Sequence, residues 1–140
     1  MDKTLLDTDI FSEILKDKHE KVRKTANEYY SIYHKYTIST ITVLEIIKGL
    51  HKVKREDKIQ LFLKSISSAE ILSLNVKSSE TAGRIFADLE LAGQPIGRAD
   101  PIVASIAIEN NIALATGNLS HYERIQKLGY KLRLKNWKEL

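Results

Sequence analysis

Residues 4–10, which read TLLDTDI, decide how the rest of the chain is interpreted. The short apolar run Thr4 to Leu6 is typical of a buried strand, and a helical pattern begins at Ile10. Asp7 and Asp9 fall between the two. This layout predicts a central strand that ends in carboxylates and leads directly into a helix.

Short strand-like runs and longer helical patterns alternate along the whole chain. Further strands are expected at Tyr36 to Ser39, Ile71 to Leu74 and Ile112 to Ala115, with a candidate fifth at Tyr130 to Leu132. Helices are expected at Ile10 to Lys16, His19 to Tyr33, Thr40 to Lys52, Arg55 to Ser65, Lys77 to Ala92 and Pro101 to Asn110. This order predicts an α/β fold in which a small, mainly parallel sheet of four to five strands is sandwiched between helices in three layers. Because the sequence contains no linker-like segment, residues 1–140 are expected to form a single domain.

The composition is that of an ordinary globular protein. Of 140 residues, 43% are hydrophobic and 29% are charged, which argues against disorder. No apolar run reaches the length of about 20 residues that a bilayer requires, and the first residues lack a leader-like layout, so we expect a cytoplasmic protein. The chain has no cysteine, which excludes disulfides and thiolate chemistry. The net charge of +4 weakly favours an anionic partner such as nucleic acid.

Polar residues follow the ends of the predicted strands, where open parallel sheets place their ligands. Asp7 and Asp9 follow the first strand, and Glu45 lies one turn into the helix after the second. Asp100 stands at the start of a later helix, and Asn118 follows the fourth strand. These residues are the candidate site.

Each candidate also has a purely structural explanation. Asp7 or Asp9 suits the N-cap of the helix that follows, and Asp100, directly before a proline, is typical of a cap as well. Glu45 points away from the apolar face of its helix, as solvated residues do. Asn118 follows a glycine, as in many turns. The evidence for a site is therefore their convergence at one edge of the sheet.

Carboxylates brought together at such an edge repel one another unless a cation neutralises them. A hard divalent ion such as magnesium prefers oxygen ligands, and it can activate a water for attack on a phosphodiester. Thr116 adds a hydroxyl at the same edge. The basic residues that could follow a nucleic-acid backbone are Lys48, Arg98, Arg124, Lys127 and the tail from Lys131 to Lys138.

Four segments, in order and in register over nearly the whole chain, resemble PIN-domain proteins. They are LLDTDI at 5–10, TITVLEI at 40–46, PIGRADPIVASIA at 95–107 and LATGNLSHYERI at 114–125, followed by Asn136-Trp137 near the end. The similarity is closest to VapC-type toxins of toxin–antitoxin modules. A single segment is a weak indication, whereas four in register are a strong one.

The resemblance implies a PIN-like fold and the toxin component of a type II toxin–antitoxin module. It implies an endoribonuclease dependent on Mg²⁺ or Mn²⁺, with Asp7 and Asp100 as the principal metal ligands, Glu45 completing the pocket and Asn118 as a further catalytic group. It also implies a homodimer that is neutralised by a VapB-type antitoxin. We expect the C-terminal segment of that antitoxin to lie across the acidic cleft and present an Arg or Lys to the carboxylates.

Two positions depart from the family pattern. Asp9 stands where the family commonly has Asn, which adds an acid and suggests a contact near the metal. Asn118 stands where many members have a fourth acid, which makes a second tightly held metal less certain.

Two other functions remain as alternatives. Asp7 and Asp9 fit the Asp-x-Asp opening of haloacid-dehalogenase-type phosphatases, with Asp7 as the nucleophile, although the later acidic motif of that class is missing from the sequence. A non-catalytic PIN-like domain that binds RNA or a partner is the second alternative, and Asn118 is its support.

Overall fold

A parallel sheet of five strands forms the centre of the computed structural model, which describes residues 1–96 and 98–139. The strands are β1 (Thr4–Leu6), β2 (Thr37–Ser39), β3 (Glu70–Leu72), β4 (Ala113–Ala115) and β5 (Leu134–Lys135). Their order across the sheet is β3-β2-β1-β4-β5, and every neighbouring pair is parallel. The chain therefore builds outward from β1 to one edge and then returns to build the other. The strand order reverses between β1 and β4, which is where such sheets bind ligands.

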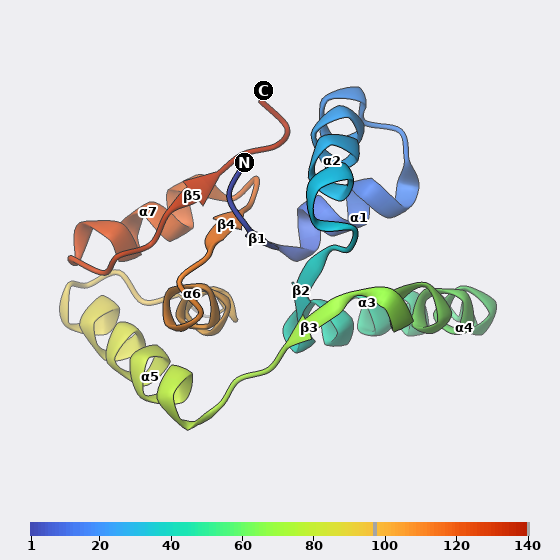
Figure 1. Ribbon diagram of the computed structural model, residues 1–140. Coiled ribbons are helices and arrows are strands. Elements are labelled where there is room, and N and C mark those ends of the chain that lie inside the picture. The colour runs from blue at the N-terminus through green and yellow to red at the C-terminus, as the bar shows by residue number, and fades with distance from the viewer. Residues whose placement is uncertain (97, 140) are drawn as a thin grey trace.

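Helices cover both faces of this sheet (Figure 1). They are α1 (Thr8–Lys16), α2 (Glu20–Tyr33), α3 (Thr40–Lys52), α4 (Glu56–Ser65), α5 (Val76–Leu91), α6 (Asp100–Glu109) and α7 (Leu119–Lys127), with a short 3₁₀ turn at Ile66–Ser68. Successive side chains of β1 point to opposite faces. Leu5 packs in a core with residues of α5, α6 and α7, and Leu6 packs in a second core with residues of α1, α2 and α4. The predicted three-layer α/β/α fold is confirmed.

The expected elements agree with the observed ones to within two residues except at the end of the chain. The candidate strand at Tyr130 to Leu132 is wrong, because the fifth strand, β5, lies further along the chain at Leu134–Lys135. Leu114 in β4 donates its N–H to the carbonyl of Arg133, and the pairing then continues from Leu134. The expected strand at Ile71 to Leu74 begins earlier, at Glu70, whose carboxylate accepts a hydrogen bond from Thr37.

Helix α7 was missing from the predicted elements. Its two buried residues, Tyr122 and Ile125, lie three positions apart, which gives a short amphipathic pattern. Because polar residues and a glycine precede it, the segment is easily read as a turn. Among the helices within residues 1–96 and 98–139, none combines the length and the apolar character needed to cross a bilayer.

Candidate active site

Asp7 combines the role of a helix cap with a place at the point where the strand order reverses. Its backbone is extended, and its Oδ1 accepts a hydrogen bond from the N–H of Thr8 at 2.9 Å, which caps α1. Its own N–H donates to the carbonyl of Ala115 in β4 at 2.9 Å. The side chain is therefore held between β1 and β4, and the residue is only 6% exposed. Asp7 can both cap α1 and take part in the site, because the cap uses Oδ1 and leaves Oδ2 for other contacts.

The second oxygen of Asp7 accepts two further hydrogen bonds. The hydroxyl of Thr116, which follows β4, donates to Oδ2 at 2.9 Å, and the hydroxyl of Tyr122 in α7 donates at 3.0 Å. Burial raises the pKa of Asp7 to about 6, and the negative charge of Asp9 contributes to this rise. The three donors at Thr8, Thr116 and Tyr122 lower the pKa and offset part of it. The carboxylate is thus costly to ionise, as expected for one that a cation neutralises.

Tyr122 connects Asp7 with Asp100. Its hydroxyl lies 3.0 Å from Asp7 Oδ2 and 3.4 Å from Asp100 Oδ1, and its ring is fully buried. Burial and the two neighbouring carboxylates raise the pKa of Tyr122 far above its ordinary value of 10. The hydroxyl consequently keeps its proton and is shared between two buried carboxylates, one between β1 and α1 and the other at the start of α6.

Asp100 does not cap α6, contrary to the expectation from the proline that follows it. Ala99 is the N-cap residue, and its carbonyl accepts the first helical hydrogen bonds, at 2.9 Å from Ile102 and 3.1 Å from Val103. Asp100 is the first residue of the helix, so its side chain is available to the site. Its Oδ2 lies 3.2 Å from His121 Nδ1 and 3.6 Å from Arg98 Nε. Two basic groups therefore approach the buried carboxylate from the exposed side.

Glu45 approaches the same edge through Thr8. The hydroxyl of Thr8 donates to Glu45 Oε1 at 2.6 Å, and it also lies 3.0 Å from the hydroxyl of Thr42. Because Thr8 directly follows Asp7, this bond fixes Glu45 beside the start of α1. Glu45 is half-buried rather than fully solvated, in contrast to what the helical pattern of α3 indicates.

Both carboxylate oxygens of Asp9 accept hydrogen bonds from backbone N–H groups. Its Oδ1 accepts from the N–H of Ile10 at 2.9 Å, and its Oδ2 accepts from the N–H of Gly117 at 2.8 Å. Lys138 Nζ lies 3.6 Å from the same Oδ2. A Cβ on Gly117 would stand 2.5 Å from Asp9 Oδ2, so only glycine allows this approach. Asp9 therefore holds the loop after β4 and the segment around Lys138, and its expected contact near the metal stays a prediction.

Asn118 lies at the N-cap position of α7, as its turn-like context indicated, but its side chain makes no capping hydrogen bond. Its backbone N–H donates to the hydroxyl of Thr116 at 3.0 Å. The residue is half-buried and close in sequence to the donors of Asp7. Asn118 therefore lies at the same edge of the sheet as Asp7, Asp9, Glu45 and Asp100. We call this part of the molecule the acidic edge.

The groups that could hold a metal ion are all oxygen donors, which favours a hard cation. Two of them, the carboxylates of Asp7 and Asp100, share the hydroxyl of Tyr122. Within the described part of the chain, no three acidic or histidine side chains are gathered closely enough to form a ready-made metal site. The arrangement thus resembles a site built on two protein carboxylates.

Three residues of this edge were not among the predicted site residues: Thr8, His121 and Tyr122. Thr8 and Tyr122 contact a predicted acid through a hydroxyl, and His121 does so through a ring nitrogen. Tyr122 and His121 follow Asn118 within one turn of α7, and they lie in the segment 114–125 that carries the family resemblance; these were their sequence signals.

A family model described as PIN domain matches residues 4–128. Because the match spans most of the chain and agrees with the fold and the acidic edge, the protein belongs to the PIN domain family.

Two relatives narrow this class to the VapC ribonucleases. The chain is 30% identical to the tRNA(fMet)-specific endonuclease VapC of Salmonella typhimurium, over 96% of this chain and 98% of the relative. It is 31% identical to ribonuclease VapC2 of Rickettsia felis, over 95% and 96% of the two chains. The protein is accordingly a nuclease that acts on RNA. Membership of this family argues against the phosphatase alternative.

Solved structures give the same result. A crystal structure of DNA-bound VapBC from Salmonella typhimurium contains a chain with a TM-score of 0.81 and 30% identity, covering 98% of this chain and 99% of that one. VapBC2 from Rickettsia felis, bound to a DNA fragment from its promoter, matches with a TM-score of 0.80 and 28% identity over 96% and 98%. Both neighbours are toxin–antitoxin complexes.

Proposed function

We propose that Asp7, Glu45, Asp100 and Asn118 form the active site of an endoribonuclease toxin that depends on Mg²⁺ or Mn²⁺. The observation that carries this proposal is the approach of two buried carboxylates, from Asp7 and Asp100, to one tyrosine hydroxyl at 3.0 and 3.4 Å. Two ionised carboxylates so close together repel each other, and a divalent cation relieves this repulsion. In our proposal Asp7 and Asp100 are the metal ligands, and Glu45 completes the set.

The donor set fits such an ion. Magnesium is commonly held by one or two carboxylates together with waters and substrate phosphate oxygens. Two buried carboxylates without a complete cage of acids agree with this preference. A softer metal would call for sulfur or several imidazole ligands, and the chain has no cysteine.

The chain's own residues prepare the reaction by orientation and proton transfer. When bound, the ion would supply positive charge to the phosphate and promote ionisation of the attacking water. The donors at Thr8, Thr116 and Tyr122 keep the carboxylate of Asp7 in one orientation. Glu45, held by Thr8, is suited to accept a proton from the attacking water, and the amide of Asn118 can donate to a phosphate oxygen.

We expect the substrate to be RNA that is unpaired where it is cut, because bases are accessible there. The relative from Salmonella typhimurium is named as specific for tRNA(fMet), so tRNA is the first substrate to test. Cytoplasmic action is part of this proposal, since that is where such RNA is found. We also expect a homodimer, as the family resemblance implies.

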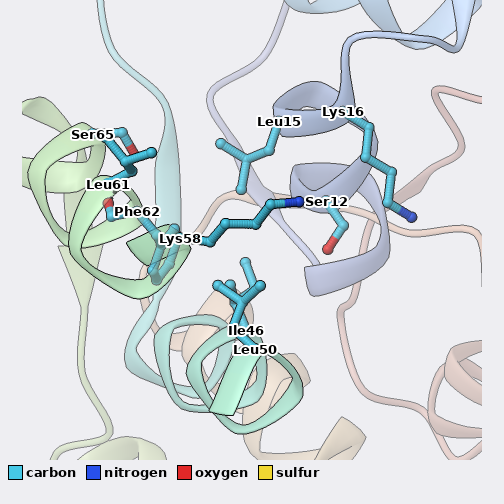
Figure 2. A pocket seen from close by; sticks show the side chains of 9 residues that line it. All are labelled: Ser12, Leu15, Lys16, Ile46, Leu50, Lys58, Leu61, Phe62 and Ser65. Atoms are coloured by element: carbon cyan, nitrogen blue, oxygen red, sulfur yellow. Dashed lines mark hydrogen bonds between the residues drawn. The ribbon is translucent and has the colours of Figure 1, made fainter. Parts of the chain in front are cut away.

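An apolar groove between α1, α3 and α4 is the surface we propose for the antitoxin. It encloses about 470 Å³ (Figure 2). Its apolar lining comes from Leu15, Ile46, Leu50, Leu61 and Phe62. Lys58 extends across the groove toward α1, and Lys16 stands at the rim (Figure 2). An antitoxin segment with apolar side chains and nearby acids would therefore fit it.

The groove leads toward the acidic edge along two helices. Ile46 in its lining directly follows Glu45, and Ser12 lies one helical turn after Thr8. A segment that fills the groove can thus continue to the carboxylates and present a cation to them, as proposed from the sequence.

The test of the nuclease proposal is internal cleavage of RNA by the purified full chain. With Mg²⁺, a labelled tRNA pool should give internal fragments, and EDTA should abolish them. Asp7→Asn and Asp100→Asn should each lower the rate by about 100-fold or more. Asp57→Asn, on the exposed start of α4, is the matched control and should cut at the parent rate. A fully active Asp7→Asn protein would contradict the proposal, and a folded, metal-loaded parent that binds RNA without cutting it would favour the non-catalytic alternative.

A further inference from the structure

Residues 136–138 are anchored beside the acidic edge. Trp137 is 2% exposed, and its ring packs against Tyr29 of α2 with the centroids 5.6 Å apart. The N–H of Lys138 donates to Asn136 Oδ1 at 3.0 Å. The backbone at Lys138 is therefore held by a buried aromatic residue on one side and by a turn-like hydrogen bond.

The side chain of Lys138 lies over the loop that leaves β4. Its Nζ is 3.6 Å from Asp9 Oδ2, and a Cβ placed on Gly117 would stand 3.3 Å from Nζ and 3.5 Å from Cδ. Gly117 directly follows Thr116, whose hydroxyl binds Asp7. The ammonium group is thus fixed next to the acidic edge, while a third of the side chain stays accessible to solvent.

The ion pair with Asp9 can be exchanged at little cost. Ion pairs that are partly exposed to solvent contribute little to stability. Asp9 keeps two backbone donors, from Ile10 and Gly117, when the ammonium leaves it. A phosphate oxygen can therefore take the place of the carboxylate without leaving a polar group unsatisfied. A site lined with acids also needs nearby positive charge to accept a polyanion, and lysine binds phosphate as a compact point charge.

We propose that Lys138 binds a non-bridging phosphate oxygen of the RNA strand next to the scissile bond, with Asp9 acting as the positioning residue that holds the ammonium there beforehand. This inference rests on the proposed ribonuclease function. The competing explanation is that the Asp9–Lys138 pair only fastens the chain terminus.

The experiment compares Lys138→Met, which keeps most of the alkyl chain, with Lys77→Met, an exposed lysine of α5 whose ion pair with Glu109 has the same length, 3.6 Å. Cleavage of a labelled tRNA pool by the full chain gives kcat and KM. Binding of the same RNA in an Asp100→Asn background gives Kd from 50 to 200 mM KCl. Lys138→Met should raise KM and Kd by about 5- to 10-fold, with kcat within about twofold of the parent. Its salt slope should fall by about 0.7, the value for one contact to a single strand.

Lys77→Met should change these quantities by less than about twofold, and Lys138→Arg should restore most of the binding. An unchanged Kd and salt slope for Lys138→Met would overturn the inference, as would a loss of unfolding stability without a change in KM. If the parent chain neither binds nor cleaves RNA, the proposed function fails and this inference fails with it. Failure of the proposed function is measured on the parent chain, whereas failure of the Lys138 inference is measured on Lys138→Met. The two failures are therefore distinguishable.

Discussion

Asp7→Asn is expected to abolish cleavage while making the metal-free protein more stable above neutral pH. Burial raises the pKa of Asp7 from its ordinary 3.8 to about 6. The folded protein therefore binds this proton more tightly than the unfolded chain does, so its stability falls as the pH rises from about 4 through 6 and is then level. At 1.36 kcal/mol for each pKa unit, the two-unit rise corresponds to a penalty of about 3 kcal/mol at pH 8.

Asparagine removes this charge but not every interaction. Its oxygen can still accept from the N–H of Thr8, whereas its NH₂ group replaces the acceptor of the Thr116 and Tyr122 hydroxyls. Loss of those acceptors offsets part of the gain, which leaves an expected stabilisation of about 1 to 2 kcal/mol at pH 8.

The assay is urea unfolding in EDTA between pH 4 and pH 8. The advantage of Asp7→Asn should shrink as the pH falls through 6 and disappear near 4. Added Mg²⁺ should narrow the difference at pH 8, because a ligand that binds only the folded parent stabilises it. Asp57→Asn is a control of opposite sign. Arg55 lowers the pKa of Asp57 to about 2, so the Arg55–Asp57 pair stabilises the folded parent fully above its ordinary pKa of 3.8, and the variant should be less stable than the parent from pH 4 to pH 8. An Asp7→Asn protein that is no more stable than the parent at pH 8 in EDTA would contradict the raised pKa of Asp7.

Three further predictions follow from individual contacts. Tyr122→Phe removes the hydroxyl shared by the two carboxylates and should weaken Mn²⁺ binding by about 10-fold or more in calorimetry; an unchanged affinity would contradict the role assigned to it. Gly117→Ala places a Cβ 2.5 Å from Asp9 Oδ2 and should lower the free energy of unfolding by about 1 to 3 kcal/mol. Gly83→Ala, with open space around it in α5, should instead stabilise by up to about 1 kcal/mol, and equal effects of the two changes would argue against the close approach. Leu61→Asp, at a groove residue that is 66% exposed, should weaken binding of a VapB-type antitoxin by about 10-fold in a titration, with RNA cleavage retained; loss of cleavage as well would indicate a folding defect.

Local patterns were sufficient to predict most elements, because a helix or a short buried strand is encoded by residues that are neighbours in the chain. The strand-end positions of Asp7 and Asn118 followed from the same patterns. As single residues, Glu45 could equally be a solvated side chain and Asp100 a helix cap. They were assigned to the site because their segments match the PIN-domain pattern in order and spacing. The fifth strand was misplaced because its only partner, β4, defines its register, and that pairing leaves no local signal.

The α/β class, the acids at the carboxyl ends of the strands and the family to which those acids belong could all be predicted from the order of residues along the chain. The hydrogen-bond partners of these acids are visible only in the folded protein. Asp7 and Tyr122 are 115 positions apart, and Asp9 and Gly117 are 108 apart, yet each pair is joined by a hydrogen bond. Such pairs form because β1 and β4 lie side by side in the sheet, and no periodicity in the chain records which strands become neighbours. For this reason Asp9 could be predicted as one more acid of the site, whereas its bonds to Gly117 and Lys138 became apparent only in three dimensions.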